Sequence, residues 1–85
     1  MAIELDIFKK KLLYRASYRG TKEMDILLYK FVNKYIHEFD ESLLRELEKF
    51  LNFEDEVILD YYQNSISKKN IDQNLVSKIF KKFRI

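Results

Sequence analysis

The chain of 85 residues contains no proline and only one glycine, Gly20. Tight turns depend on these two residue types, because proline fixes one backbone angle and glycine adopts angles that other residues avoid. A β-rich chain of this length would need several of them at its turns. Apolar residues make up 47% of the chain, which is typical of a folded domain and too high for a disordered segment. The sequence therefore predicts an all-α fold.

Five segments carry apolar residues at the helical spacing of three and four positions. The predicted helices cover residues 5–17, 22–36, 41–51, 54–63 and 71–83, the last of them beginning at Ile71 or Asp72. Residues 64–70 are polar and are predicted to form a loop. Helices joined by short connections make a small five-helix bundle, and we expect residues 1–85 to form a single domain.

Local signals support several of the predicted helix ends. Asp40 is a favourable N-cap for the third helix, because its side chain can accept a hydrogen bond from a free backbone N–H. Gly20 follows the first helix, where a left-handed backbone is common and glycine adopts it without steric cost. In the last helix the apolar spacing predicts five inward-facing residues, namely Leu75, Val76, Ile79, Phe80 and Phe83.

The residue types needed for catalysis or metal binding are scarce. Cysteine is absent, which excludes disulfides and thiol chemistry, and His37 is the single histidine. A metal site needs several convergent ligands, and the acidic residues lack the spacing of a calcium-binding loop. One glycine cannot build a Gly-rich phosphate loop. We therefore predict a protein that is not an enzyme, binds no metal and no stable cofactor, and works through a surface.

The net charge of +2 hides an uneven distribution along the chain. Residues 1–20 carry a net charge of +3, residues 21–65 of −6 and residues 66–85 of +5. One interpretation is charge complementarity within the bundle and on its solvated faces. The other is a polarised surface that orients a protein partner.

A nucleic-acid function is a further alternative, because the C-terminal segment is basic and contains Phe80 and Phe83. Its cationic residues are Lys68, Lys69, Lys78, Lys81, Lys82 and Arg84. Helical spacing, however, places both phenylalanines in the core. No predicted helix carries Arg, Asn and Gln together on one polar face, as readers of base edges do. We therefore expect no nucleic-acid partner.

Membrane and export signals are weak in this sequence. No stretch approaches the ~20 apolar residues of a membrane span, and the N-terminus lacks the apolar region of a secretory signal. Glu4 and Asp6 do not fit a mitochondrial presequence, which is poor in acids. We therefore expect a protein without membrane insertion, monomeric when free, that resides in the cytoplasm if its source is bacterial.

The corner between the first two predicted helices is not explained by packing alone. Gly20 leaves a place without a side chain, where a partner can approach the backbone closely. Arg19 offers a planar fork of donors, and Glu23 offers an acceptor one turn later. The alternative is a structural turn that contains a local Arg19–Glu23 ion pair.

This corner also resembles the signature of a known family. Residues 19–23, Arg-Gly-Thr-Lys-Glu, match the R-G-x-x-E motif of the succinate dehydrogenase flavinylation assembly factors. Residues 12–15, Leu-Leu-Tyr-Arg, and residues 24–28, Met-Asp-Ile-Leu-Leu, resemble the flanking L-L-Y-R and E-x-D-x-L-L patterns of that family. Residues 50–55 resemble its L-L-x-x-x-D, which opens the fourth helix.

The resemblance spans roughly residues 11–62 and is weaker in its second half. Glu56 stands where the family usually has proline, and Tyr61 stands where it commonly has tryptophan. Both changes are compatible with a helix start and a core aromatic residue.

The resemblance implies a small five-helix chaperone for the flavoprotein subunit of succinate dehydrogenase or fumarate reductase. Such a factor promotes covalent attachment of FAD to its partner, and FAD is then the partner's cofactor. The location implied for a eukaryotic source is the mitochondrial matrix. The residues that would contact the flavoprotein are Arg19, Gly20 and Glu23, with Tyr14, Arg15 and Asp25 as further candidates. A helical adaptor with a different partner is the alternative.

Overall fold

The computed structural model describes the backbone of residues 2–83 and the side chains of residues 4–83. Within this range all regular structure is helical. The elements are α1 (Ala2–Ser17), α2 (Lys22–Tyr35), α3 (Glu41–Leu51), α4 (Asp55–Asn64), a short 3₁₀ helix η1 (Ile71–Gln73) and α5 (Leu75–Lys82). The predicted all-α class and the five main helices are therefore confirmed.

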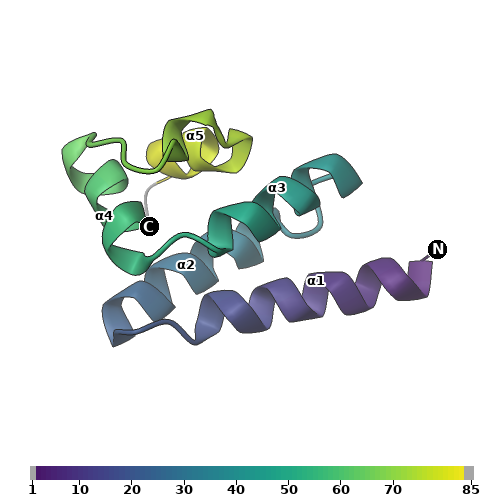
Figure 1. Ribbon diagram of the computed structural model, residues 1–85. Helices are drawn as coiled ribbons and strands as arrows, with labels where there is room; N and C mark the ends of the chain where they lie inside the picture. The colour runs from purple at the N-terminus through teal and green to yellow at the C-terminus, as the bar shows by residue number, and fades with distance from the viewer. Residues whose placement is uncertain (1, 84–85) are drawn as a thin grey trace.

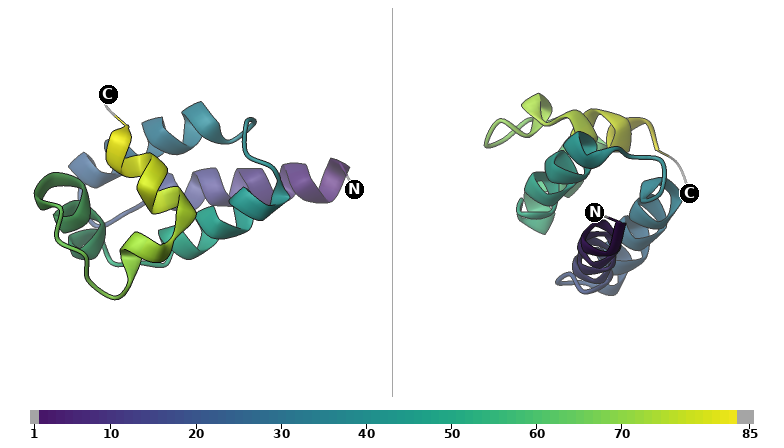
Figure 2. Two further views of the ribbon diagram at one scale, coloured as in Figure 1. Left: turned by 90° about the horizontal axis from the view of Figure 1, so that it is seen from above. Right: turned by 90° about the vertical axis from the view of Figure 1, so that its right-hand side faces the viewer.

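The packing of the helices does not simply follow their order in the chain. In Figure 1, α1 lies along the lower edge and α2 returns beside it in the opposite direction. The next helix, α3, packs against α1, and α5 packs against both α3 and α4. The second view in Figure 2 shows α1 end-on, with α5 at the opposite side of the molecule. None of the described helices is long and apolar enough to span a membrane.

An aromatic cluster forms the centre of the core. Phe31 of α2 is fully buried, and its ring centroid lies 6.2 Å from that of Phe50, 4.9 Å from Phe80 and 5.3 Å from Phe83. All three contacts are edge-on, an arrangement that aromatic pairs prefer over face-to-face stacking. The cluster therefore joins α2, α3 and α5 across the bundle.

The predicted ends of α3 are confirmed. The Asp40 side chain accepts a hydrogen bond of 2.9 Å from the N–H of Leu43, as an N-cap should. Other helix ends differ from the prediction by one to three residues. Helix α1 begins three residues earlier than predicted, and α4 begins and ends one residue later. The end of α2 comes one residue early.

The last predicted helix is interrupted at Asn74. This buried side chain accepts a hydrogen bond from the N–H of Ser77 at 2.9 Å and donates one to the Glu46 carbonyl at 2.9 Å. Asn74 therefore caps α5 and separates it from η1. The prediction that Leu75 faces inward was wrong, because this first residue of α5 is 50% exposed.

The loop that follows α4 contains three residues with left-handed backbone, Ser65, Lys69 and Asn70. Ser65, with φ of 57°, ends α4, and the Ile66 N–H reaches back to the Asp60 carbonyl at 3.2 Å. Glycine is the residue usually preferred at a left-handed position that ends a helix, because it has no Cβ.

We expect Ser65→Gly to raise the free energy of unfolding by about 0.5–1 kcal/mol, because glycine has no Cβ to clash in this conformation. Urea unfolding measures the change. Ser65→Ala is the control, since it also removes the hydroxyl that accepts from Lys81 but keeps the Cβ. A glycine variant no more stable than the alanine variant would contradict this explanation.

Candidate functional site

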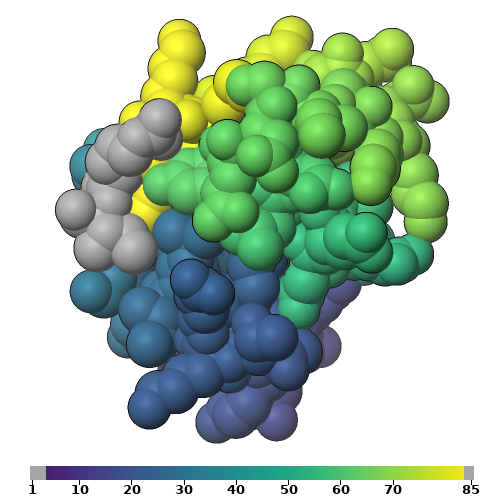
Figure 3. Space-filling view, turned by 90° about the vertical axis from the view of Figure 1, so that its left-hand side faces the viewer, coloured from purple at the N-terminus to yellow at the C-terminus, as the bar shows by residue number. Residues whose placement is uncertain are grey.

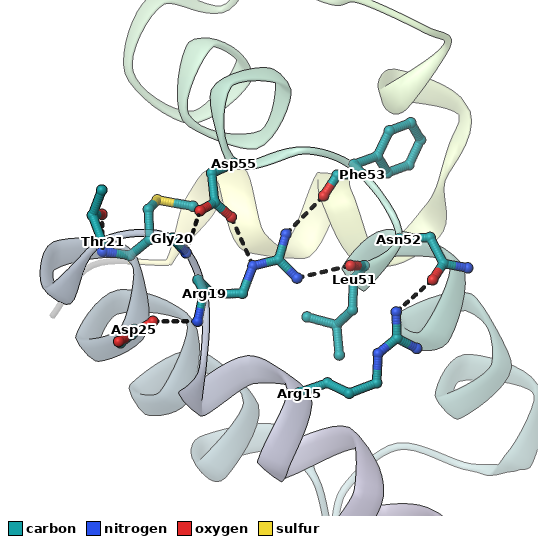
Figure 4. A network of polar contacts seen from close by, with 10 residues as sticks. Arg15, Arg19, Gly20, Thr21, Asp25, Leu51, Asn52, Phe53 and Asp55 are labelled. Atoms are coloured by element: carbon teal, nitrogen blue, oxygen red, sulfur yellow. Dashed lines mark hydrogen bonds and ion pairs between the residues drawn. The ribbon is translucent and has the colours of Figure 1, made fainter.

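Two connections of the chain meet at one end of the bundle. The first joins α1 to α2 and contains the predicted corner, and the second joins α3 to α4. Figure 3 looks onto this end, with the start of α2 below α4. Figure 4 shows the polar side chains that link the two connections.

Arg19 makes the central link. Its Nε donates to Asp55 Oδ1 at 2.7 Å, Nη1 donates to the Leu51 carbonyl at 2.8 Å, and Nη2 donates to the Phe53 carbonyl at 2.7 Å. Leu51 is the last residue of α3, where backbone carbonyls lack helical partners. The planar guanidinium satisfies three acceptors in three directions, which a lysine ammonium on a flexible stem would not hold as rigidly. We call Arg19, Asp55 and the two carbonyls the Arg19 clamp.

The Arg19 side chain is only 11% exposed, so little of its surface is accessible to a partner. Arg19 was expected to offer its donors to a partner, or else to pair with Glu23. The local Arg19–Glu23 pair was wrong, because the guanidinium pairs with Asp55 in α4 instead. The charged fork therefore holds the two connections together.

Gly20 serves the clamp through its backbone and through its missing side chain. Its N–H donates to Asp55 Oδ2 at 2.9 Å, so both carboxylate oxygens of Asp55 accept hydrogen bonds from the corner. The expected left-handed backbone at Gly20 was wrong, because its φ is not positive. A Cβ at this position would lie 3.0 Å from Asp55 Oδ2. Glycine is therefore favoured here by the close approach of a carboxylate.

The start of α2 is fixed by two more contacts. Thr21 is the N-cap, and its Oγ1 accepts a hydrogen bond of 3.2 Å from the Met24 N–H. The Asp25 carboxylate accepts a hydrogen bond from the backbone N–H of Arg19. The corner thus has a defined conformation before any partner binds.

The six predicted site residues differ in how much of their surface is available. Gly20, Glu23 and Tyr14 are exposed, whereas Arg19, Asp25 and Arg15 are partly buried and bonded within the chain. Arg15 donates to the side chain of Asn52, in the connection between α3 and α4. Among the described residues, no side chain forms a hydrogen bond or ion pair with the Glu23 carboxylate.

Sequence reasoning missed two residues of this site. Asp55 lies in the stretch that resembles the family pattern, where the sequence predicts only the start of a helix. Thr21 precedes a helical apolar pattern, which is the usual place of an N-cap threonine. The signals were present, but the partner of Asp55 could not be deduced from them.

A shallow groove lies beside Glu23, between α2 and α4. Its lining is mainly apolar and consists of Glu23, Ile26, Leu27, Leu59, Tyr62 and Gln63. The exposed carboxylate therefore stands at the edge of an apolar surface. This combination suits a partner segment that carries both an apolar side chain and a positive charge.

The acidic and basic parts of the chain meet in ion pairs near α4. Lys68 donates to Asp60 at 2.8 Å, and Lys69 donates to Glu54 at 2.8 Å. The hydrogen bond from Lys68 lowers the pKa of Asp60, and the one from Lys69 lowers the pKa of Glu54. Both carboxyl pKa values are lower in the folded protein than in the unfolded chain. These ion pairs therefore stabilise the fold at pH values above the ordinary carboxyl pKa, and this stabilisation is lost as the pH falls through the lowered pKa.

The aromatic residues of the C-terminal segment, which suggested nucleic-acid binding, are not at the surface. Phe80 and Phe83 are buried, so their rings are not available to stack on bases. Arg84, part of the predicted basic cluster, lies outside the described residues. Across residues 4–83, no group of three His, Cys, Asp or Glu side chains is placed to hold a metal ion.

Comparison with known families gives one match over most of the chain. The sequence profile of the family described as "flavinator of succinate dehydrogenase" matches residues 10–84. No solved structure gives a significant match.

Three relatives named succinate dehydrogenase assembly factor 2, mitochondrial, are similar to this chain. The protein from Dictyostelium discoideum is 31% identical over 78 residues, which cover 92% of this chain and 53% of the relative. The one from Scheffersomyces stipitis is 38% identical over 48 residues, which cover 56% of this chain and 32% of the relative. The one from Drosophila virilis is 43% identical over 44 residues, covering 52% and 28% respectively. The matched segments thus span between 28% and 53% of the length of these relatives.

Proposed function

Because the chain belongs to the family of flavinators of succinate dehydrogenase, we propose that it is an assembly factor that binds the flavoprotein subunit of that enzyme. In this proposal it promotes covalent attachment of FAD to the subunit, and the fumarate reductase flavoprotein is a second possible client. The factor contributes binding and orientation, and FAD stays with the partner, which carries the flavin chemistry.

The observation that supports this proposal best is the fixed corner between α1 and α2. The Arg19 clamp and the Thr21 cap hold its backbone, while Gly20 and Glu23 face outward. A preorganised surface loses little conformational entropy on binding, which increases affinity without further contacts. We propose that Gly20 permits close approach of the flavoprotein and that Glu23 provides the charged contact.

Glu23→Ala is the sharpest test of the contact, because among the described residues no side chain forms a hydrogen bond or ion pair with the Glu23 carboxylate. We expect it to weaken binding by about 10- to 100-fold, since losing a hydrogen bond to a charged group costs roughly 1.5–3 kcal/mol. The thermal stability should change by less than about 0.5 kcal/mol, as for other surface substitutions. The assay mixes the protein with apo-flavoprotein and FAD, denatures the mixture and measures flavin fluorescence on the protein band of a gel.

The matched control is Glu38→Ala, which removes an exposed acidic side chain beyond the far end of α2. It should leave covalent flavin at the wild-type level. Flavin attachment that does not depend on the factor at all would refute the proposed function. Attachment that depends on the factor but is equal in both variants would refute only the role of Glu23.

Substitution at Gly20 is a less specific test. A bulky residue there would block the approach of a partner, but it would also press on Asp55 and disturb the clamp. A loss of flavinylation in such a variant therefore combines two causes, whereas Glu23 separates them.

A further inference from the structure

The outer face of α1 is apolar as well as its inner face. Leu12 and Ala16 of the inner face are buried in the core, as expected for an amphipathic helix. On the opposite side of the helix, Ile7 and Tyr14 are 48% and 66% exposed. Tyr18, which directly follows the last helical residue Ser17, is 68% exposed. The separation of seven positions aligns Ile7 with Tyr14 on the helix, and the Tyr18 ring lies next to that of Tyr14. We call these three residues the α1 stripe.

The two tyrosines of the stripe form a single exposed aromatic surface. Their ring centroids lie 4.6 Å apart, with an angle of 40° between the ring planes. Tyrosine is enriched at the centres of protein interfaces, because it buries a large area while fixing few rotatable bonds. A row of large exposed apolar side chains on one helix indicates a surface that is covered in a complex.

Cations border the stripe. Lys10, Lys11 and Arg15 line an open hollow together with Ile7 and Tyr14. In Figure 1, α1 lies at the edge of the molecule, with the other helices on its inner side. The partner that fits this face therefore presents apolar side chains bordered by carboxylates.

The stripe is continuous with the corner described above. Tyr18 directly precedes Arg19, and Arg15 donates to Asn52 next to the Arg19 clamp. One partner seated on Gly20 and Glu23 would therefore also reach Tyr18 and Tyr14. A second copy of this chain fits less well, because apposing two stripes would bring Lys10 and Lys11 of both copies together.

We infer that the α1 stripe is a second part of the flavoprotein interface, and that it receives an apolar, acid-bordered surface of the flavoprotein subunit. This inference rests on the proposed function. Glu23 and the stripe then have opposite charge requirements, so they orient the factor on its partner.

The test measures binding of the full chain to purified apo-flavoprotein by isothermal titration calorimetry. We expect Tyr18→Ser to raise the dissociation constant about tenfold, as loss of an aromatic anchor does. The double variant Lys10→Glu/Lys11→Glu should weaken binding by a similar factor at low salt and by less at high salt. The side chains of Lys10, Lys11 and Tyr18 are all exposed, and circular dichroism checks that each variant folds.

Matched controls lie on the opposite side of the bundle. Leu75→Ser removes an apolar side chain of 50% exposure, compared with 68% for Tyr18, and Lys78→Glu/Lys82→Glu reverses two exposed cations of α5. Both controls should bind as tightly as the wild type. Loss of binding in the α1 variants alone supports the inference.

Three results would overturn it. If the α1 variants bind normally while Glu23→Ala binds weakly, the proposed function stands and the stripe has no part in it. If the wild type does not bind the flavoprotein, both proposals fail. If sedimentation shows that the chain alone forms a dimer that Tyr18→Ser dissociates, the stripe is covered by a second copy.

Discussion

Arg19→Met is expected to lower the free energy of unfolding by about 2–4 kcal/mol. The substitution keeps an apolar stem but removes three hydrogen bonds, leaving the Asp55 carboxylate and the carbonyls of Leu51 and Phe53 without their donors. Each partly buried acceptor that loses its partner carries a desolvation cost of roughly 1–3 kcal/mol, part of which water recovers at this depth. The domain as a whole is stabilised by roughly 4–13 kcal/mol, so the loss is large.

Chemical unfolding of Arg19→Met, Asp55→Asn and the double variant measures the coupling free energy between Arg19 and Asp55. We expect a coupling free energy of about 1–3 kcal/mol, as found for residues in one polar network. Arg15→Met is the matched control, one helical turn earlier, where a single bond to Asn52 is lost and the cost should be below about 1 kcal/mol. Additive effects of the two clamp variants would show that Arg19 and Asp55 do not act as a pair.

Variants of Arg19 separate two roles for this residue, namely direct contact with the flavoprotein and positioning of the residues that make the contact. With its side chain enclosed, Arg19 would act on the partner by positioning Gly20 and Glu23. Arg19→Lys keeps the charge but cannot reach three acceptors in one plane. It should therefore not restore the binding of the flavoprotein that is lost in Arg19→Met. A lysine variant that restores flavinylation fully would indicate that the positive charge contacts the flavoprotein directly.

Phe31→Ala is expected to have the largest effect on stability, about 3–5 kcal/mol. The side chain is fully buried at the centre of the aromatic cluster, where it contacts rings of α3 and α5. Truncation removes its buried area and leaves a cavity that the surrounding helices fill only in part. At about 4 °C or more per kcal/mol, the melting temperature should fall by more than about 12 °C.

Tyr29→Ala is the matched control for this variant. Tyr29 lies on the same helix but is exposed, so its removal should change stability by less than about 0.5 kcal/mol. Calorimetry of both variants gives the comparison. Similar melting temperatures for the two would mean that Phe31 does not occupy the packed centre of the fold.

The features that could be predicted from sequence depend on nearby residues. The bounds of α3 followed from the Asp40 cap and from a regular apolar stripe, both of which lie within one short segment. The buried positions of Phe80 and Phe83 followed from helical spacing in the same way. Secondary structure and the inward faces are therefore largely local properties of this chain.

The features that could not be predicted depend on residues far apart. Arg19 had one acidic neighbour at helical spacing, Glu23, and its actual partner lies in another helix. Gly20 suggested a left-handed turn, whereas the constraint comes from the carboxylate of Asp55. Asn74 was predicted to lie inside the last helix. Its role as a cap could not be seen from nearby residues, because one of its partners, the Glu46 carbonyl, belongs to α3.

The Arg19 clamp joins residues that are 36 positions apart in the chain. Contacts of this separation require a long loop to close, whereas the helices and their neighbouring pairs form from local contacts. The clamp is therefore expected to form after the folding transition state and to act mainly by slowing unfolding. Its contribution is to the lifetime of the corner, so that a flavoprotein encounters it in one long-lived conformation.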